Sequence, residues 1–350
     1  MKNKEFKKGV AIGVAATLVV TGAGFVSYQK VLFPKGNALS DMKTVQKLNY
    51  LEELIDEEYL DEKDESSLRE GLYAGLLSGL QDPYSTYYTA EQYKELNTSN
   101  EGSYVGIGAV LQKDNDGGAT VVQLYEGGPG EQAGLKTGDV IKAIDGTDVT
   151  EKETSDIASM VRDSEKDSVT LTIQRENEEK TQDIKVEIRD VEIKTVSHEM
   201  LSGDTGYIRI SEFSEVTSDQ YKKAFADLKS QGMKKLVVDL RDNPGGLLNT
   251  VCDILRQILP EGLIVYTEDK NGKREEETCD GKNELDIPLA VLVNGNSASA
   301  SEIFAGAVKD YGIGTIVGTT TYGKGVVQTI QPLTDGSAVK ITIAKYFTPK

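Results

Sequence analysis

The chain has 350 residues and a formal net charge of −18, because 57 acidic residues outnumber 39 basic ones. This length suits about two ordinary domains of roughly 150 residues each. An acidic chain is repelled by phosphate backbones, so we expect no nucleic-acid partner. Two cysteines, Cys252 and Cys279, do not make a disulfide framework. A single histidine and no Cys/His cluster give no zinc signature, so neither a metal nor a cofactor is expected.

The first 30 residues combine a basic flank, MKNKEFKK, with an uncharged run over residues 9–28. About twenty apolar residues can cross a bilayer. The four lysines of the flank favour a cytoplasmic N-terminus, with the rest of the chain outside. We therefore predict a cytoplasmic tail at 1–8 and a single transmembrane anchor at 9–29. A cleaved signal peptide is the alternative.

Residues 36–102 are predicted to form an N-terminal helical region. Leucines and one isoleucine recur there at spacings of three and four, at Leu48, Leu51, Leu54, Ile55, Leu68, Leu72, Leu76 and Leu80. Asp82-Pro83 ends this pattern. Apolar faces of this kind serve packing or self-association, so a homodimer formed through this region is one expectation.

Residues 103–190 change to short β-rich runs, with one helical stretch, SDIASMVRD, before the last of them. The segment GGPGEQAGLKTGDVIKAIDG (127–146) resembles the PDZ family. That resemblance implies a small β-sandwich with a carboxylate-binding loop at Tyr104, Val105, Gly106, Ile107 and Gly108. Backbone N–H groups of a glycine-containing loop can hold an anion, and the strand edge after it can take an extended peptide. Arg162 is a candidate sensor of the bound tail, with an ordinary solvated arginine as the alternative.

Residues 191–350 alternate apolar strands with amphipathic helices, which predicts a largely buried sheet with helical cover. Within it, VNGNSASASEIFAGAVKD (293–310) places three serines at alternate positions where a strand pattern becomes helical. A serine at a helix N-terminus benefits from free amides and the helix dipole. The alternative is that a serine there is only an N-cap.

A nucleophilic serine needs a base. His198 lies in a polar segment before a strand, VSHEMLSGD, and is interpreted as a surface residue. Lys324 lies between two glycines in GTTTYGKGVVQTI (318–330), where small neighbours allow it to be enclosed. Enclosure is necessary, because a base must be neutral and burial lowers a lysine pKa. An ordinary surface lysine is the alternative.

A third block, VVDLRDNPGGLL (237–248), is an apolar strand followed by Arg-Asp-Asn-Pro-Gly-Gly. Unpaired amides at the end of such a strand can stabilise an oxyanion. Pro244 fixes one dihedral angle, and Gly245 permits a close backbone approach. A purely structural turn is the alternative.

In chain order, DPYSTYY (82–88), the PDZ block, GYIRISEF (206–213), LRDNPGG, NSASASE and YGKGVVQ together resemble the carboxyl-terminal processing peptidases, which are PDZ-bearing serine proteases. The resemblance implies a mixed α/β protease core with an inserted PDZ domain, and further chain after KYFTPK. Residue by residue it implies the nucleophile Ser299, the base Lys324, the lysine-orienting Gln328, and oxyanion donors at the backbone amides of Gly245 and Ala300.

The resulting hypothesis is a bacterial serine endopeptidase anchored in the plasma membrane, with its catalytic part outside the cytoplasm. Its PDZ module, 103–190, would bind free C-termini of protein substrates, and its core, 191–350, would cut them. One rival is a catalytically silent PDZ adaptor, which has no need of a neutral lysine. A second is an esterase or amidase with a small substrate, which has little use for a PDZ groove.

Overall fold

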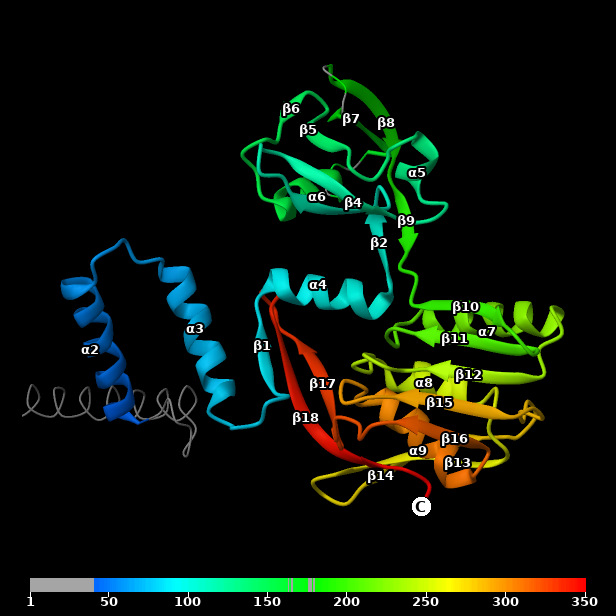
Figure 1. Cartoon of the computed structure of the whole chain (residues 1–350). Helices are drawn as coiled ribbons and strands as arrows, with labels where there is room; N and C mark the ends of the chain where they lie inside the picture. Colours follow the sequence, from blue (N-terminus) through cyan, green and yellow to red (C-terminus); the bar gives the residue numbers. More distant parts are fainter. Residues whose placement is uncertain (1–40, 163, 165, 176–177, 179) are drawn as a thin grey trace, which may run out of the picture. The chain divides into compact units, whose positions relative to one another are not determined.

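The computed structural model describes residues 41–350, apart from 163, 165, 176–177 and 179, and divides into two units at Tyr73/Ala74 (Figure 1). Two helices begin the described chain, α2 (Met42–Glu58) and α3 (Glu65–Ser78). Asp41 caps α2 by accepting the Lys43 N–H at 3.2 Å. Neither helix has a buried residue. Most of their leucines are exposed rather than packed in a core.

The prediction of a membrane-spanning fold, and of a single-pass protein in the plasma membrane, is corrected. Residues 1–40, with the predicted anchor at 9–29, lie outside the described residues. Within residues 41–350, no helix is both long enough and apolar enough to cross a bilayer. The longest described helix, α2, has 17 residues and ends in a strongly acidic stretch, whereas a crossing needs about 20 mostly apolar residues.

Residues 103–192 form a β-rich module with its own core. Strands β2 (Ser103–Gly106) and β9 (Arg189–Glu192) pair at its base. Its main sheet has the order β3-β4-β5-β7-β8, with β6 added to β5. These strands are β3 (Ala109–Lys113), β4 (Ala119–Leu124), β5 (Val140–Ile144), β6 (Thr147–Asp148), β7 (Ser168–Gln174) and β8 (Gln182–Glu187), and the helices are α5 (Pro129–Ala133) and α6 (Thr154–Arg162). Alternate residues of β7 are buried, as expected for a sheet with one solvated face. Strand β3 lies at the sheet edge.

The second part of the chain is built on a five-stranded sheet of order β10-β11-β12-β15-β16. The strands are β10 (Val196–Leu201), β11 (Thr205–Ile210), β12 (Lys235–Asp239), β15 (Leu289–Val293) and β16 (Gly314–Gly318). All neighbours are parallel except β10 and β11. Helices α7 (Thr217–Ser230), α8 (Leu248–Leu255) and α9 (Ala300–Tyr311) contribute to its core. The carboxyl ends of β12 and β15 are adjacent, so the loops after these strands meet. Binding sites of open α/β sheets usually lie at this end of the strands.

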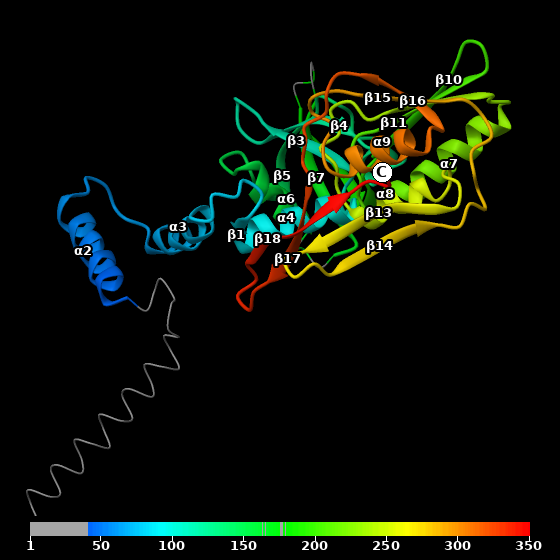
Figure 2. The same cartoon turned by 90° about the horizontal axis from the view of Figure 1, so that it is seen from below.

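A second five-stranded sheet packs on the other side of α8 and α9. It contains β1 (Thr86–Tyr88), β13 (Gly262–Asp269), β14 (Arg274–Cys279), β17 (Val326–Pro332) and β18 (Ala338–Phe347), and α4 (Ala90–Glu101) follows β1. Strand β1 pairs with β18, which in turn pairs with β17 (Figure 2). This pairing brings residues 82–88 beside the C-terminal strands, although more than 200 residues separate them in sequence.

Candidate active site

The serine turn, residues 294–299, follows β15 and leads into α9. Ser297 is buried, and its hydroxyl donates to the backbone oxygen of Leu240 at 2.8 Å. Ser301 is also buried, and its hydroxyl donates to the backbone oxygen of Asn243 at 3.0 Å. Ser299 is half-buried and has a φ of 55°, a strained value for a residue other than glycine. Such strain concentrates at functional sites, so Ser299 is the candidate nucleophile.

The glycine loop, residues 240–247, follows β12 and touches the serine turn. Gly245 has a φ of 108°, and a Cβ placed there would lie 2.7 Å from Ser299 Cβ and 3.0 Å from the Ala300 nitrogen. Only glycine fits so close an approach. The two predicted oxyanion donors, Gly245 and Ala300, are thus brought together beside Ser299. The Gly245 N–H, however, donates to Asn243 Oδ1 at 2.8 Å.

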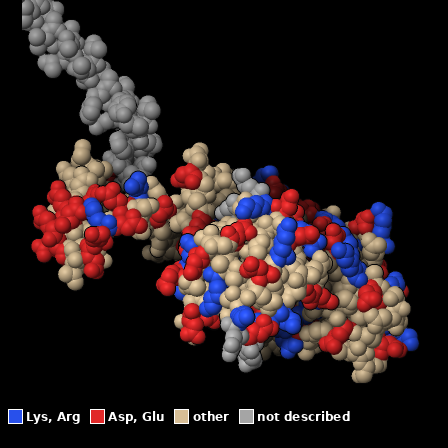
Figure 3. All heavy atoms as spheres, turned by 90° about the horizontal axis from the view of Figure 1, so that it is seen from above, with Lys and Arg blue, Asp and Glu red and all other residues tan. Residues whose placement is uncertain are grey.

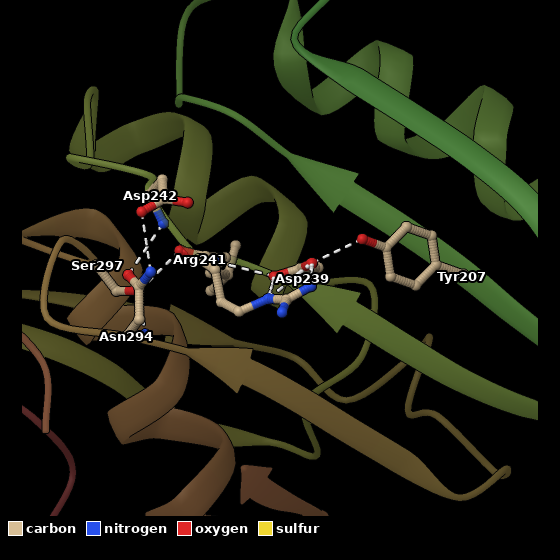
Figure 4. Close-up of polar contacts among 7 residues, drawn as sticks. Tyr207, Asp239, Arg241, Asp242, Asn294 and Ser297 are labelled. Atoms are coloured by element: carbon tan, nitrogen blue, oxygen red, sulfur yellow. Dashed lines mark hydrogen bonds and ion pairs between the residues drawn. The ribbon is translucent and has the colours of Figure 1, made fainter. Parts of the chain in front are cut away.

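Two polar clusters brace the glycine loop (Figure 4). The buried carboxylate of Asp239 accepts from the Tyr207 hydroxyl at 2.6 Å and from Arg241 Nη2 at 2.6 Å. Asp242 accepts from the Asn294 amide at 2.9 Å, and its own N–H donates to Asn294 Oδ1 at 3.0 Å. The second cluster crosses from the glycine loop to the serine turn, so it fixes these two segments against each other.

Lys324 lies in the lysine loop, residues 319–325, which joins β16 to β17. Its side chain is half-buried, and burial lowers the pKa of its amine below the usual value. The positive charge of Lys340 lowers this pKa further. The carboxylates of Glu302 and Asp82 act in the opposite direction. A lysine in these surroundings is more easily neutral than a solvated one.

The structure does not join the predicted catalytic side chains directly. Lys324 Nζ lies 5.1 Å from the ring centroid of Tyr84. In the part of the chain that the structure describes, no hydrogen bond links Lys324 Nζ to Ser299 Oγ. Gln328 lies in β17, where its amide donates to Thr342 Oγ1 at 3.2 Å. The predicted nucleophile and the predicted base therefore lie on neighbouring segments, and their side chains are not hydrogen-bonded to each other.

Glu302 connects these segments, and the sequence interpretation missed it. Its Oε2 accepts the Ser299 N–H at 2.8 Å and the Lys324 N–H at 2.9 Å. Its Oε1 accepts the Gly323 N–H at 2.7 Å and the Thr321 hydroxyl at 2.8 Å. One carboxylate thus holds the start of α9 and the lysine loop together. The available signal was the Ser-x-x-Glu spacing of a capping box, here Ser299 to Glu302.

Tyr346, from β18, closes the same junction. Its hydroxyl donates to the backbone oxygen of Lys324 and lies 3.4 Å from Glu302 Oε2. Burial raises the pKa of Tyr346, and the nearby Glu302 charge adds to the effect. The tyrosine therefore stays protonated and able to donate.

His198 lies outside this site, in agreement with its interpretation as a surface residue. It is on β10, not in a loop as its polar neighbours suggested, and its Nε2 lies 2.9 Å from Asp227 Oδ2. Alternating residues of an edge strand tolerate polar side chains, which explains the error. Arg162 ends α6, and its Nη2 donates to Ser159 Oγ at 3.0 Å.

The predicted carboxylate loop spans the end of β2 and the start of β3. Val105 is exposed, whereas Ile107 is buried. Gly108 has a φ of 71°, and its carbonyl accepts the Tyr125 N–H at 3.0 Å. The ring of Tyr104 packs edge-on against Tyr125, and a Cβ on Gly106 would meet that Tyr104 ring. The positive φ of Gly108 and the close packing at Gly106 explain why this loop contains glycines.

We predict that Glu302→Ala loosens the lysine loop. The amides of Gly323 and Lys324 lose a charged acceptor, and a hydrogen bond of this type contributes about 1.5–3 kcal/mol. Their hydrogen exchange should accelerate by roughly tenfold to a hundredfold. Asp310→Ala, at the other end of α9, is the matched control and should leave both amides unchanged. Equal exchange at these amides in Glu302→Ala and the parent chain would refute the role of Glu302.

Comparison with known sequences places three family matches along the chain. Residues 204–350 match peptidase family S41, residues 120–175 match a PDZ domain, and residues 18–92 match the N-terminal domain of the activating protease CtpB. Among solved structures, a photosystem II D1 C-terminal processing protease is 30% identical, with a TM-score of 0.47, over 86% of this chain and 82% of that one.

Two curated relatives cover almost the whole chain. A probable CtpA-like serine protease of Staphylococcus aureus (strain N315) is 36% identical over 348 residues, which are 97% of this chain and 68% of the relative. Its counterpart in Staphylococcus epidermidis is 33% identical over 339 residues, 96% of this chain and 67% of the relative. The chain therefore belongs to the CtpA-like serine proteases of peptidase family S41, the PDZ-bearing C-terminal processing peptidases.

Proposed function

We propose that this serine peptidase cuts peptide bonds with Ser299 as the nucleophile and Lys324 as the general base. The observation that carries the proposal is the shared acceptor Glu302, whose Oε2 binds the backbone N–H of both residues. Two features add support. Ser299 is strained at the start of a helix, and burial lowers the pKa of Lys324.

The proposed reaction follows from these roles. Neutral Lys324 takes the hydroxyl proton of Ser299 while the Ser299 oxygen attacks the substrate carbonyl carbon. The resulting ammonium then gives its proton to the leaving amine, and an acyl-enzyme remains. Lys324, neutral again, takes a proton from water, which attacks the ester carbonyl and releases the new C-terminus. Ser299 regains its proton from Lys324 in this last step.

The oxyanion would be stabilised by the backbone N–H groups of Ala300 and Gly245. Ala300 is the first residue of α9, where the helix dipole favours negative charge. The Gly245 N–H must first leave Asn243 Oδ1, and the Lys324 amine must leave the Tyr84 ring. Gln328 then orients the lysine. We propose that substrate binding causes both groups to leave these partners.

The PDZ module is proposed to select protein substrates by their free C-termini. Strand β3 is an edge strand and can accept an extended peptide as a further strand. The loop of Tyr104 to Gly108 at its start would bind the terminal carboxylate, with Arg162 as a sensor of the bound tail. The domain bounds 36–102, 103–190 and 191–350 stay predictions.

We also propose that α2 and α3 pair with those of a second copy. Their exposed leucines border a groove of about 440 Å³ that includes Leu51, Leu68 and Leu72. Acidic side chains crowd the same part of the chain (Figure 3). An apolar strip within such a charged surface is typical of a protein interface rather than of a solvated helix.

Ser299→Ala and Lys324→Ala should each lower the cleavage rate of a flexible protein with an apolar C-terminus by at least about a thousandfold, as for other cooperating catalytic residues. Binding of a peptide with that C-terminus should remain in Ser299→Ala and weaken when its carboxylate is amidated. Ser297→Ala is the comparison for a neighbouring serine. Turnover near the parent rate in Ser299→Ala or Lys324→Ala would refute the pair.

Leu51→Glu combined with Leu72→Glu should shift the chain from dimer to monomer in sedimentation, because burying the new charges is costly. Glu53→Lys, a charge change on α2 outside the groove, should not affect assembly. The proposal fails if the parent chain sediments as a monomer at micromolar concentration.

A further inference from the structure

The segment DPYSTYY lies next to the proposed base, and the proposed mechanism uses none of it apart from the contact of Tyr84 with Lys324. Its first residues form a turn that is closed by Asp82, whose Oδ2 accepts the Ser85 hydroxyl at 2.6 Å and whose Oδ1 accepts the Tyr84 N–H at 3.1 Å. Ser85 is buried. The chain then enters β1 and pairs with β18. The turn is therefore closed by Asp82 and continues into a paired strand.

Thr342 links this turn to Gln328. The Thr342 N–H donates to Ser85 Oγ at 3.0 Å, and its hydroxyl accepts from Gln328 Nε2 at 3.2 Å. Hydrogen bonding by Ser85 and Thr342 lowers the pKa of Asp82, so Asp82 stays charged at neutral pH. A chain of contacts thus runs from a charged carboxylate to the side chain that is proposed to orient the base.

The aromatic ring of the turn faces the base itself. Lys324 Nζ lies 5.1 Å from the centroid of Tyr84, within the range of a cation–π interaction. This attraction acts only on the charged amine. A protonated Lys324 is therefore held at Tyr84, whereas a neutral Lys324 is released from that attraction.

We propose that the turn Asp82–Ser85 is a positioning element for the base of this peptidase. Tyr84 holds the charged Lys324 side chain away from Ser299 until a substrate enters, and Ser85 with Thr342 fixes the amide of Gln328. The inference rests on the proposed Ser299/Lys324 pair and adds residues to it.

The pKa of Lys324 depends on the surrounding charges and on the Tyr84 ring. The charged groups that act on it are Glu302 from α9, Lys340 from β18 and Asp82 from the turn itself. Tyr84 favours the charged form and so raises the pKa of Lys324. Tyr84→Leu keeps an apolar side chain but removes the ring, so the pKa should fall by roughly half to one unit. Tyr84→Phe keeps the ring face and should leave the pKa unchanged.

The first experiment measures this pKa without turnover. The full chain carrying Ser299→Ala is treated with an amine-acylating reagent across a pH series, and mass spectrometry gives the labelling rate of Lys324. The proposal predicts a lower midpoint for Tyr84→Leu and an unchanged midpoint for Tyr84→Phe. An unchanged midpoint in Tyr84→Leu, a rise, or an equal shift in both variants would overturn it.

A second experiment tests the link to Gln328. Thr342→Val and Gln328→Ala should each reduce kcat/KM by about tenfold, because each removes the hydrogen bond between the two side chains. The double variant should be no slower than either single variant, whereas independent sites give multiplied losses. Thr342→Ser retains the hydroxyl and should recover the parent rate. Multiplied losses, or no rescue by serine, would contradict the link.

These outcomes are separable from failure of the proposed function. If Ser299→Ala still cuts substrate, the nucleophile assignment fails while the labelling of Lys324 can still be read. If Ser299→Ala is inactive and the labelling midpoints do not differ, only the positioning role of the turn fails.

Discussion

The proposed site depends on the hydrogen bonds that the carboxylate of Glu302 accepts. It accepts backbone N–H groups from Ser299 at the start of α9 and from Gly323 and Lys324 in the lysine loop. A backbone hydrogen bond from the Tyr322 N–H to the Ser297 oxygen, at 3.0 Å, also links the lysine loop to the serine turn. A charged acceptor forms stronger hydrogen bonds than a neutral one, so it can hold Ser299 in its strained conformation while it holds the lysine loop nearby.

Two of the groups in the proposed reaction have other partners within the protein. The Gly245 N–H donates to Asn243, and the Lys324 amine lies over Tyr84. Breaking a neutral hydrogen bond costs about 0.5–1.5 kcal/mol, and breaking a cation–π contact costs about 0.5–2 kcal/mol. Their sum is a few kcal/mol, which a bound peptide can supply through strand pairing. These internal contacts are therefore strong enough to oppose the catalytic arrangement and weak enough for a bound peptide to replace them.

Sequence patterns predicted most of the α/β core, because its strands are continuous apolar runs and its helices are amphipathic. The apolar strand predicted before Arg-Asp-Asn-Pro-Gly-Gly is β12, and the change from strand to helix predicted within 293–310 lies between β15 and α9. The family resemblance, rather than these patterns, implied that Gly245 and Ser299 lie close together, as they do in the structure. The prediction of a membrane-spanning fold was contradicted, because no helix within residues 41–350 is long and apolar enough to cross a bilayer.

Other features depended on contacts between distant segments, which local patterns do not contain. Strand β1 has three residues and exists only because β18 pairs with it. His198 was placed in a polar segment before a strand, although β11 supplies the hydrogen bonds of a strand there. Glu302 was quoted within NSASASE but given no role, because its partners in the lysine loop lie about twenty residues further along the chain.

The central claim is that Ser299 is a nucleophile activated by Lys324. The most direct measurement is to treat the full chain with a fluorophosphonate reagent at neutral pH and to locate the adduct by mass spectrometry. The account predicts a single adduct on Ser299 that forms in the parent chain and is lost in Lys324→Ala. An adduct on Ser297 or Ser301, or equally fast labelling of Ser299 in Lys324→Ala, would contradict it.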